Sequence, residues 1–202
     1  MDALLSICLG IGLSAACGFR IFIPLLIMSI ASLSGHPTLS HGFEWIGTYP
    51  ALAAFGVASI LEISAYYIPW LDNLLDTIAA PTAFIAGTVV MASTVSDMSP
   101  FLKWTLALIV GGGIAGIIQG FTSITRVASS ATTMGLGNPV LSTLEAGGSI
   151  ALSILSIALP IIAGLAVLVV LYFASKKVFR KIFKHTDLKA QHDNADYINP
   201  RL

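Results

Sequence analysis

The sequence predicts an all-α integral membrane protein with about six transmembrane helices, arranged as two inverted three-helix repeats that contain broken helices. Hydrophobic residues make up 56% of the 202-residue chain and charged residues only 10%. A soluble domain carries about a quarter charged residues, so charge this sparse cannot cover a surface that faces water. A second observation, a set of short elements that occurs twice in the same order, predicts the repeats.

The first apolar segment, residues 4–33, is too long for one straight span, because about 20 apolar residues cross the hydrocarbon core. Gly18-Phe19-Arg20 and Pro24 interrupt it. We therefore expect one broken span here, followed by a polar loop at about residues 34–49.

Two further apolar segments complete the first half, which we predict as a membrane repeat over residues 1–99. Residues 51–68 follow Pro50 and carry Glu62. Residues 70–80 have the spacing of a short amphipathic helix, and Pro81 is expected to start the third span.

The second half, predicted as a membrane repeat over residues 100–175, has a similar plan. A glycine-rich apolar run at 101–119 is expected to break at Gly120-Phe121, and a polar stretch at 122–138 follows. Pro139 opens the next span, and the chain enters the last span near Pro160. Residues 176–202 form a basic tail.

The internal repeat is the most informative pattern in the sequence. Gly-Phe occurs at 18–19 and 120–121, and Ser-x-Leu-Glu occurs at 59–62 and 142–145. In both halves a proline followed by Ala-Gly and aliphatic residues comes next. Three spans in each half would place the second half in the opposite orientation, which is the arrangement of an inverted-topology repeat.

The charge distribution predicts the orientation and the partners. Seven of the ten Lys and Arg residues lie between Lys176 and Arg201. Such a tail is typical of the cytoplasmic side, where it meets anionic lipid. With six spans, both termini would be cytoplasmic. We expect the lipid bilayer as partner and no nucleic acid, and the glycine-rich spans would permit a homo-oligomer.

Three sequence runs resemble a known family: GLSAACGFRIFIP at 12–24, PWLDNLLDT at 69–77 and GLGNP at 135–139. They resemble domain of unknown function 4126, a family of small bacterial inner-membrane proteins. The resemblance covers nearly the whole chain except the tail. It implies a multi-pass protein of the bacterial inner (cytoplasmic) membrane, and it implies no activity, cofactor or catalytic residue.

Four charged residues in the apolar segments are the candidate ion- or substrate-binding site: Arg20, Glu62, Arg126 and Glu145. Ionisable groups inside a membrane cost about 2.5–3.5 kcal/mol each on insertion scales. The glutamates could bind a proton or cation, with the arginines meeting an anion or holding broken helices. Alternatively, the four residues form structural Glu–Arg pairs. The sequence leaves both interpretations open.

Two other groups of polar residues are weaker candidates. Asp72 and Asp76 are four positions apart and share one helix face, so we interpret them as interfacial carboxylates. The second group could line a pore in a re-entrant segment or form a small-residue packing surface. Its members are Ser129, Ser130, Thr133 and Asn138.

No sequence motif indicates catalysis. His36, His41 and Glu44 lie in one loop, but their spacing is too loose to predict a metal site, and no nucleophile–base set is recognisable. We therefore expect no enzyme, no metal and no cofactor. The sequence favours a small permease or channel for an ion or small solute. The alternative is a non-transporting membrane scaffold or a subunit of a partner complex.

Overall fold

The structure, a computed structural model, describes residues 3–36, 39–65, 67–96 and 98–177, with the backbone alone at residues 69–74 and 76. This part of the chain is helical and contains no strand. The elements in order are α1 (Ala3–Phe19), α2 (Phe22–Leu33), the 3₁₀ helix η1 (Glu44–Gly47), α3 (Tyr49–Ala65), α4 (Pro69–Thr94), α5 (Pro100–Leu106), the π-helical turn η2 (Ala107–Gly112), α6 (Gly113–Thr133) and α7 (Asn138–Ala158). A further helix follows at Pro160–Lys177.

Four of the described helical segments are long and apolar enough to cross a membrane: Thr77–Thr94, Pro100–Thr133, Asn138–Ala158 and Pro160–Lys177. Helices α1, α2 and α3 are apolar but shorter. Large apolar side chains such as Ile109, Ile124, Val127 and Leu144 are more than 60% exposed, as lipid-facing side chains would be. The predicted class, an all-α membrane protein, is confirmed at this level.

The contacts divide the chain into two units, Met1–Leu165 and Ala166–Leu202. In the second unit, the rings of Tyr172 and Phe173 meet edge to face with their centroids 5.6 Å apart. The basic tail from residue 178 onward lies outside the described residues. The predicted boundaries after residues 99 and 175 stay predictions.

Helix α1 is the central helix of the first unit. All of its residues from Leu9 to Gly18 are buried, and it packs against α4, α6 and α7. Small side chains allow this packing. A Cβ atom on Gly10 would collide with Met91 of α4, and one on Gly18 would lie 2.6 Å from Cβ of Ile118 in α6.

The predicted interruption at Gly18-Phe19-Arg20 is confirmed, because α1 ends at Phe19 and α2 begins at Phe22. Pro24 gives the physical reason: a proline has no N–H to donate and its ring clashes with the preceding turn, so the helix ends before it.

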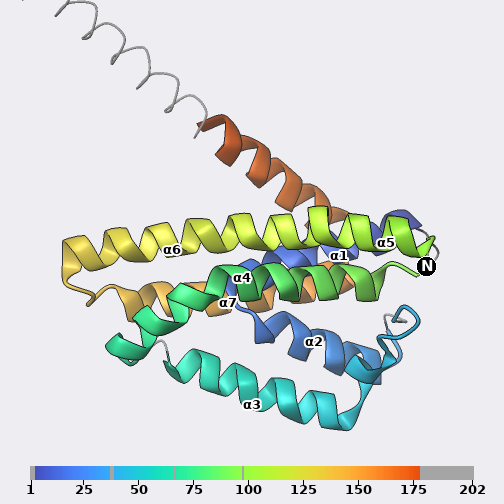
Figure 1. The fold of residues 1–202 in the computed structure, drawn as a ribbon, viewed down its shortest axis with the longest axis horizontal. Coiled ribbons are helices and arrows are strands. Elements are labelled where there is room, and N and C mark those ends of the chain that lie inside the picture. The colour runs from blue at the N-terminus through green and yellow to red at the C-terminus, as the bar shows by residue number, and fades with distance from the viewer. Residues whose placement is uncertain (1–2, 37–38, 66, 97, 178–202) are drawn as a thin grey trace, which may run out of the picture. The chain divides into compact units, whose positions relative to one another are not determined.

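The chain reverses direction at this interruption, so residues 4–33 do not form the single broken span that we expected. Gly10 of α1 contacts Met91 of α4, and Met28 of α2 accepts a hydrogen bond from Ser93 of α4. Gly10 lies before the interruption and Met28 lies after it, at similar distances along the chain, and both contact the same part of α4. Helices α1 and α2 therefore form an antiparallel pair (Figure 1), which we call the α1–α2 hairpin.

Two predicted breaks are absent from the structure. Pro81 lies inside the continuous helix α4, and Gly120-Phe121 lie inside α6. A proline within a membrane helix is tolerated where neighbouring helices support it, and Ala79, Ala83 and Ala86 around Pro81 are buried.

The polar stretch that follows Gly120 stays helical because its hydroxyl groups bond to the helix itself. Thr122 Oγ1 donates to the carbonyl of Gln119, and Thr125 Oγ1 donates to that of Phe121, both at 2.9 Å. These side chains therefore need no water at membrane depth. A re-entrant segment, one of the two interpretations that the sequence left open, is not formed, since α6 continues to Thr133 and turns into α7 through Met134 and Gly135, both at positive φ.

Helix α4 fixes the relative directions of its neighbours. Ser14 of α1 donates to the carbonyl of Gly87 at 2.9 Å, and Gly10 meets Met91, so α1 and α4 are antiparallel. Phe84 and Thr88 of α4 both lie against Gly112, and Phe84 also lies near Gly116. Figure 1 shows α6 antiparallel to α4 as well. Helices α1 and α6 therefore run parallel.

A close approach of α4 to η2 predicts a sensitive glycine. A Cβ atom on Gly87 would lie 2.5 Å from both Cβ of Ala115 and the carbonyl oxygen of Gly111. We expect Gly87→Ala to lower the free energy of unfolding by about 1–3 kcal/mol, because overpacking forces the helices apart. Thermal unfolding in detergent micelles measures it.

Gly120→Ala is the matched control. A Cβ atom on Gly120 meets nothing within 4 Å, and alanine favours a continuous helix by about 1 kcal/mol over glycine. We expect it to be neutral or stabilising. Equal losses in both variants would contradict both the close α4–η2 contact and the continuity of α6.

Candidate functional site

The interruption between α1 and α2 leaves backbone N–H groups that the helix cannot satisfy. The first N–H groups of any helix have no partner inside it. At the start of α2 they include those of Ile21 and Phe22, in the interior of an apolar bundle where an unpaired N–H is costly.

The carboxylate of Glu62 satisfies these two groups. Its Oε1 accepts from the N–H of Ile21 at 2.8 Å, and its Oε2 accepts from the N–H of Phe22 at 3.1 Å. Glu62 lies near the end of α3 and is 9% exposed. A carboxylate is also favoured at this position by the positive end of the α2 dipole.

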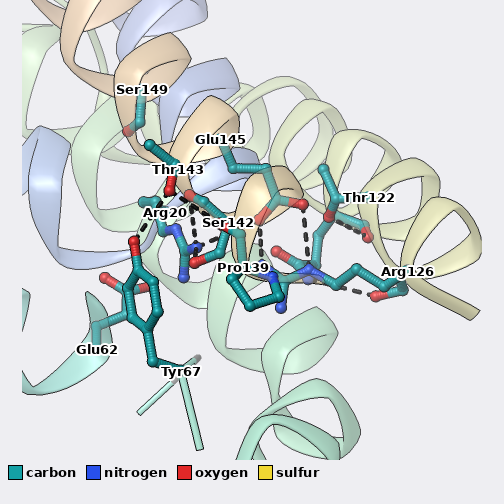
Figure 2. A network of polar contacts seen from close by, with 12 residues as sticks. Arg20, Glu62, Tyr67, Thr122, Arg126, Pro139, Ser142, Thr143, Glu145 and Ser149 are labelled. Atoms are coloured by element: carbon teal, nitrogen blue, oxygen red, sulfur yellow. Dashed lines mark hydrogen bonds and ion pairs between the residues drawn. The ribbon is translucent and has the colours of Figure 1, made fainter. Parts of the chain in front are cut away.

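The second glutamate, Glu145 in the second turn of α7, is shared by two arginines. Arg126 of α6 donates from Nε to Glu145 Oε1 at 3.1 Å, and its Nη2 contacts Oε2. Arg20 Nη2 lies 3.4 Å from the same Oε2 and donates to the carbonyl of Ser142 at 2.9 Å. Figure 2 shows the two arginines approaching Glu145 from opposite sides.

These four residues form what we call the charge cluster: Arg20, Glu62, Arg126 and Glu145. Among the described side chains, these are the charged ones that are buried. Both arginines also interact electrostatically with Glu62. Two positive and two negative groups make the cluster neutral when all are ionised, and pairing of this kind lowers the cost of placing charge in an apolar interior.

The predicted site residues thus come together from four places in the sequence. Whether they bind an ion is a separate question, and that assignment stays a prediction.

Tyr67 and Thr143 lie at the edge of the cluster, and no sequence signal indicated them. The Tyr67 hydroxyl lies 2.9 Å from Thr143 Oγ1, beside Glu62 and Arg20 (Figure 2). Tyr67 is 51% exposed, so the cluster lies close to the surface on this side.

Sequence reasoning also missed the polar buried face of α7. Every buried residue of this helix is polar, whereas Val140, Leu144 and Ile154 are exposed. The sequence does contain the signal, because the buried residues recur every three or four positions, as on one helix face. They are Asn138, Ser142, Glu145, Ser149, Ser153 and Ser156.

The serine half of this face is tightly packed against α1. Ser149 Oγ donates to the carbonyl of Ala16 at 3.0 Å, and a Cβ atom on Gly12 would collide with Ser156. The serines therefore act as small packing residues that let two helices approach. The buried face of α7 is polar along its whole length, but from Ser149 onward its side chains are fully buried.

The predicted pore-lining residues bond to one another at the turn between α6 and α7. Thr133 Oγ1 donates to the carbonyl of Ser129 at 2.8 Å and accepts from the N–H of Gly137 at 3.0 Å. Asn138 Nδ2 donates to Ser130 Oγ at 3.0 Å. These contacts stabilise the turn, and a pore-lining role stays a prediction.

Asp72 and Asp76 lie on α4, but their side chains are outside the described residues. In the loop, His41 Nδ1 lies 3.7 Å from Glu44 Oε1, and both side chains are exposed. The described residues contain no group of three or more metal-ligating side chains that could hold an ion.

The fold and the cluster define a class: a polytopic α-helical membrane protein with a buried, neutral cluster of two arginines and two glutamates. The chain belongs to the family described as Domain of unknown function (DUF4126), whose model matches residues 7–180. The family resemblance of the sequence is thereby confirmed. No curated protein and no solved structure matches the chain.

The shared carboxylate of Glu145 predicts a large stability effect. Glu145→Gln leaves two buried guanidinium groups with one remaining carboxylate, and removing one partner of a buried ion pair costs about 3–5 kcal/mol. We expect a loss of this size, measured by unfolding titration in mixed micelles. The double variant Arg126→Gln/Glu145→Gln should recover part of it.

Glu44→Gln is the control for this series, because Glu44 is an exposed loop carboxylate and exposed pairs contribute about 0–1 kcal/mol. If Glu145→Gln were no more destabilising than Glu44→Gln, the cluster would not be a set of coupled buried charges.

Proposed function

We propose that this protein is a small permease or channel for an ion or small solute, in the inner membrane of a bacterium. The charge cluster is its binding region. Glu62 and Glu145 serve as proton or cation sites, and Arg20 and Arg126 set the charge balance and hold the helices around the interruption.

The observation that carries this proposal is the position of Glu62 on a helix interruption within an apolar bundle. Transporters commonly build their sites where helices are discontinuous, because exposed backbone groups and nearby charges can bind an ion there. Ionisable residues at membrane depth are costly and are retained where they function.

We further propose a topology of five membrane crossings and the α1–α2 hairpin, in place of six crossings. The hairpin returns the chain to the side on which α1 begins, so it adds no crossing. With the basic tail in the cytoplasm, Arg126 would lie toward the cytoplasmic side and residues 34–48 toward the outside. Ala3 would then also lie outside, which revises the expectation that both termini are cytoplasmic.

For the internal repeat, our proposal is confined to the two Ser-x-Leu-Glu segments. Ser59 and Glu62 are buried on α3, as Ser142 and Glu145 are on α7, and α3 and α7 run in opposite directions (Figure 1). A full inverted repeat would also require α1 and α6 to be antiparallel, and they are parallel. The two glutamate segments alone are consistent with inverted symmetry.

A non-transporting scaffold or complex subunit is the second candidate, and the pairing within the cluster favours it. Glu145 contacts both arginines and Glu62 bonds to two N–H groups, so each carboxylate has a structural partner. In that case the charges would only hold helices together, and neutralising Arg126 and Glu145 together would leave function unchanged.

The proposal predicts flux through purified protein in proteoliposomes. We expect wild-type protein to dissipate an imposed gradient of a proton, alkali cation or small anion from a test panel, read with an internal fluorescent dye. Glu62→Gln should lower that flux at least tenfold while the protein still elutes as a folded species. Glu44→Gln, outside the cluster, should keep the flux.

Flux equal to that of empty liposomes for the whole panel, from well-folded wild-type protein, would count against the permease. Unchanged thermal stability of wild type with every ion at pH 4 to 9 would do so independently, because a ligand that binds the native state stabilises it. Both results together would favour the scaffold.

A further inference from the structure

We propose that Glu62 is a protonatable latch that holds the α1–α2 hairpin closed against α3. The latch is a conformational device, and it goes beyond the proposed function because it does not depend on which species crosses the membrane.

The latch is a contact between separate elements. The hydrogen bonds of Glu62 link α3 to the N–H groups of Ile21 and Phe22, about 40 residues earlier in the chain. These N–H groups lie at the interruption, where no continuous helix restrains α2 relative to α1. Glu62 therefore ties the interruption to α3, in addition to the packing of α2 against α3.

The contact requires an ionised carboxylate. Ionised, Glu62 offers two acceptor oxygens and makes charge-assisted bonds, which are about twice as strong as neutral ones. A proton taken up from water converts one oxygen into an O–H donor. One of the two N–H groups then loses a good acceptor, and the other keeps a weaker, neutral one. Protonation should therefore release the first turn of α2.

The surroundings of Glu62 make its protonation consequential for the other charges. When Glu62 is protonated, Glu145 is the one remaining negative charge in the cluster. The two arginines are then drawn toward Glu145 on α7. The titratable and charged groups that face Glu62 from neighbouring elements are Cys17 of α1, Arg20 at the interruption, Arg126 of α6, Glu145 of α7 by way of Arg20, and Tyr67 after α3. On α4, the charged residues nearest in sequence are Asp72 and Asp76, whose side chains lie outside the described residues.

Hydrogen–deuterium exchange of the reconstituted protein tests the latch. Protection of the backbone amides of Ile21, Phe22, Ile23 and Leu25 is measured from pH 8 to pH 4 and corrected for the intrinsic pH dependence of exchange. We expect wild type to lose protection there about 10- to 100-fold as pH falls, the range expected for losing hydrogen bonds to a charged group. Glu62→Gln, which keeps the shape of the side chain, should show low protection at every pH.

Glu44→Gln is the control, because Glu44 is an exposed carboxylate outside the charge cluster and bonds to the N–H of Gly42, not to the amides of α2. It should keep the pH-dependent change at the start of α2. Should Glu62→Gln fail to fold, the wild-type profile still decides, since a flat profile would overturn the latch. A pH dependence that persists in Glu62→Gln or disappears in Glu44→Gln would overturn it as well.

The latch and the proposed function fail separately. Flux in proteoliposomes with a flat exchange profile would reject the latch and keep the permease. A pH-dependent release of α2 that disappears in Glu62→Gln, without flux for any ion tested, would keep the latch and reject the permease.

Discussion

The structure depends on one requirement: a backbone N–H group that is buried away from water needs an acceptor. Pro24 ends helix α1 early, and the interruption leaves the N–H groups of Ile21 and Phe22 without helical partners in an apolar bundle. Glu62 supplies two acceptors from α3. Because the groups involved cannot turn to solvent, this contact fixes where α2 begins and how α3 lies beside it. An interruption without the carboxylate would leave costly unpaired groups.

The charge that solves this problem creates another, since a carboxylate in an apolar interior needs compensation. Arg20 and Arg126 provide it, and Glu145 balances the second positive charge. Each member therefore depends on the others, and the cluster joins the interruption, α3, α6 and α7. A cluster of this kind can be a rigid structural joint or a site that responds to protons. The position of Glu62 at the interruption between α1 and α2 favours the second interpretation.

Away from the cluster, the bundle is assembled through small residues. Glycines of α1, α4 and η2 bring backbones into contact, and Ser149 of α7 packs on α1 with its hydroxyl group bonded to the carbonyl of Ala16. In lipid, close packing and hydrogen bonds replace the hydrophobic effect as the source of association between helices. The charge cluster lies close to the surface, whereas the buried serines of α7 from Ser149 to Ser156 are packed against neighbouring helices.

The sequence by itself determined the class of protein, most of the helices, the interruption before Pro24 and the four charged residues of the cluster. These follow from composition, from local backbone chemistry and from the cost of charge in lipid, which are all properties of short segments. Tertiary structure alone decided the rest. Pro81 and Gly120 were expected to end helices, yet packing around Pro81 and hydroxyl bonds after Gly120 keep both helices continuous. The reversal at Arg20 and the parallel course of α1 and α6 depend on contacts between residues far apart in the chain. So does the choice of partners in the cluster, because a sequence shows which charges are present but not which atoms meet.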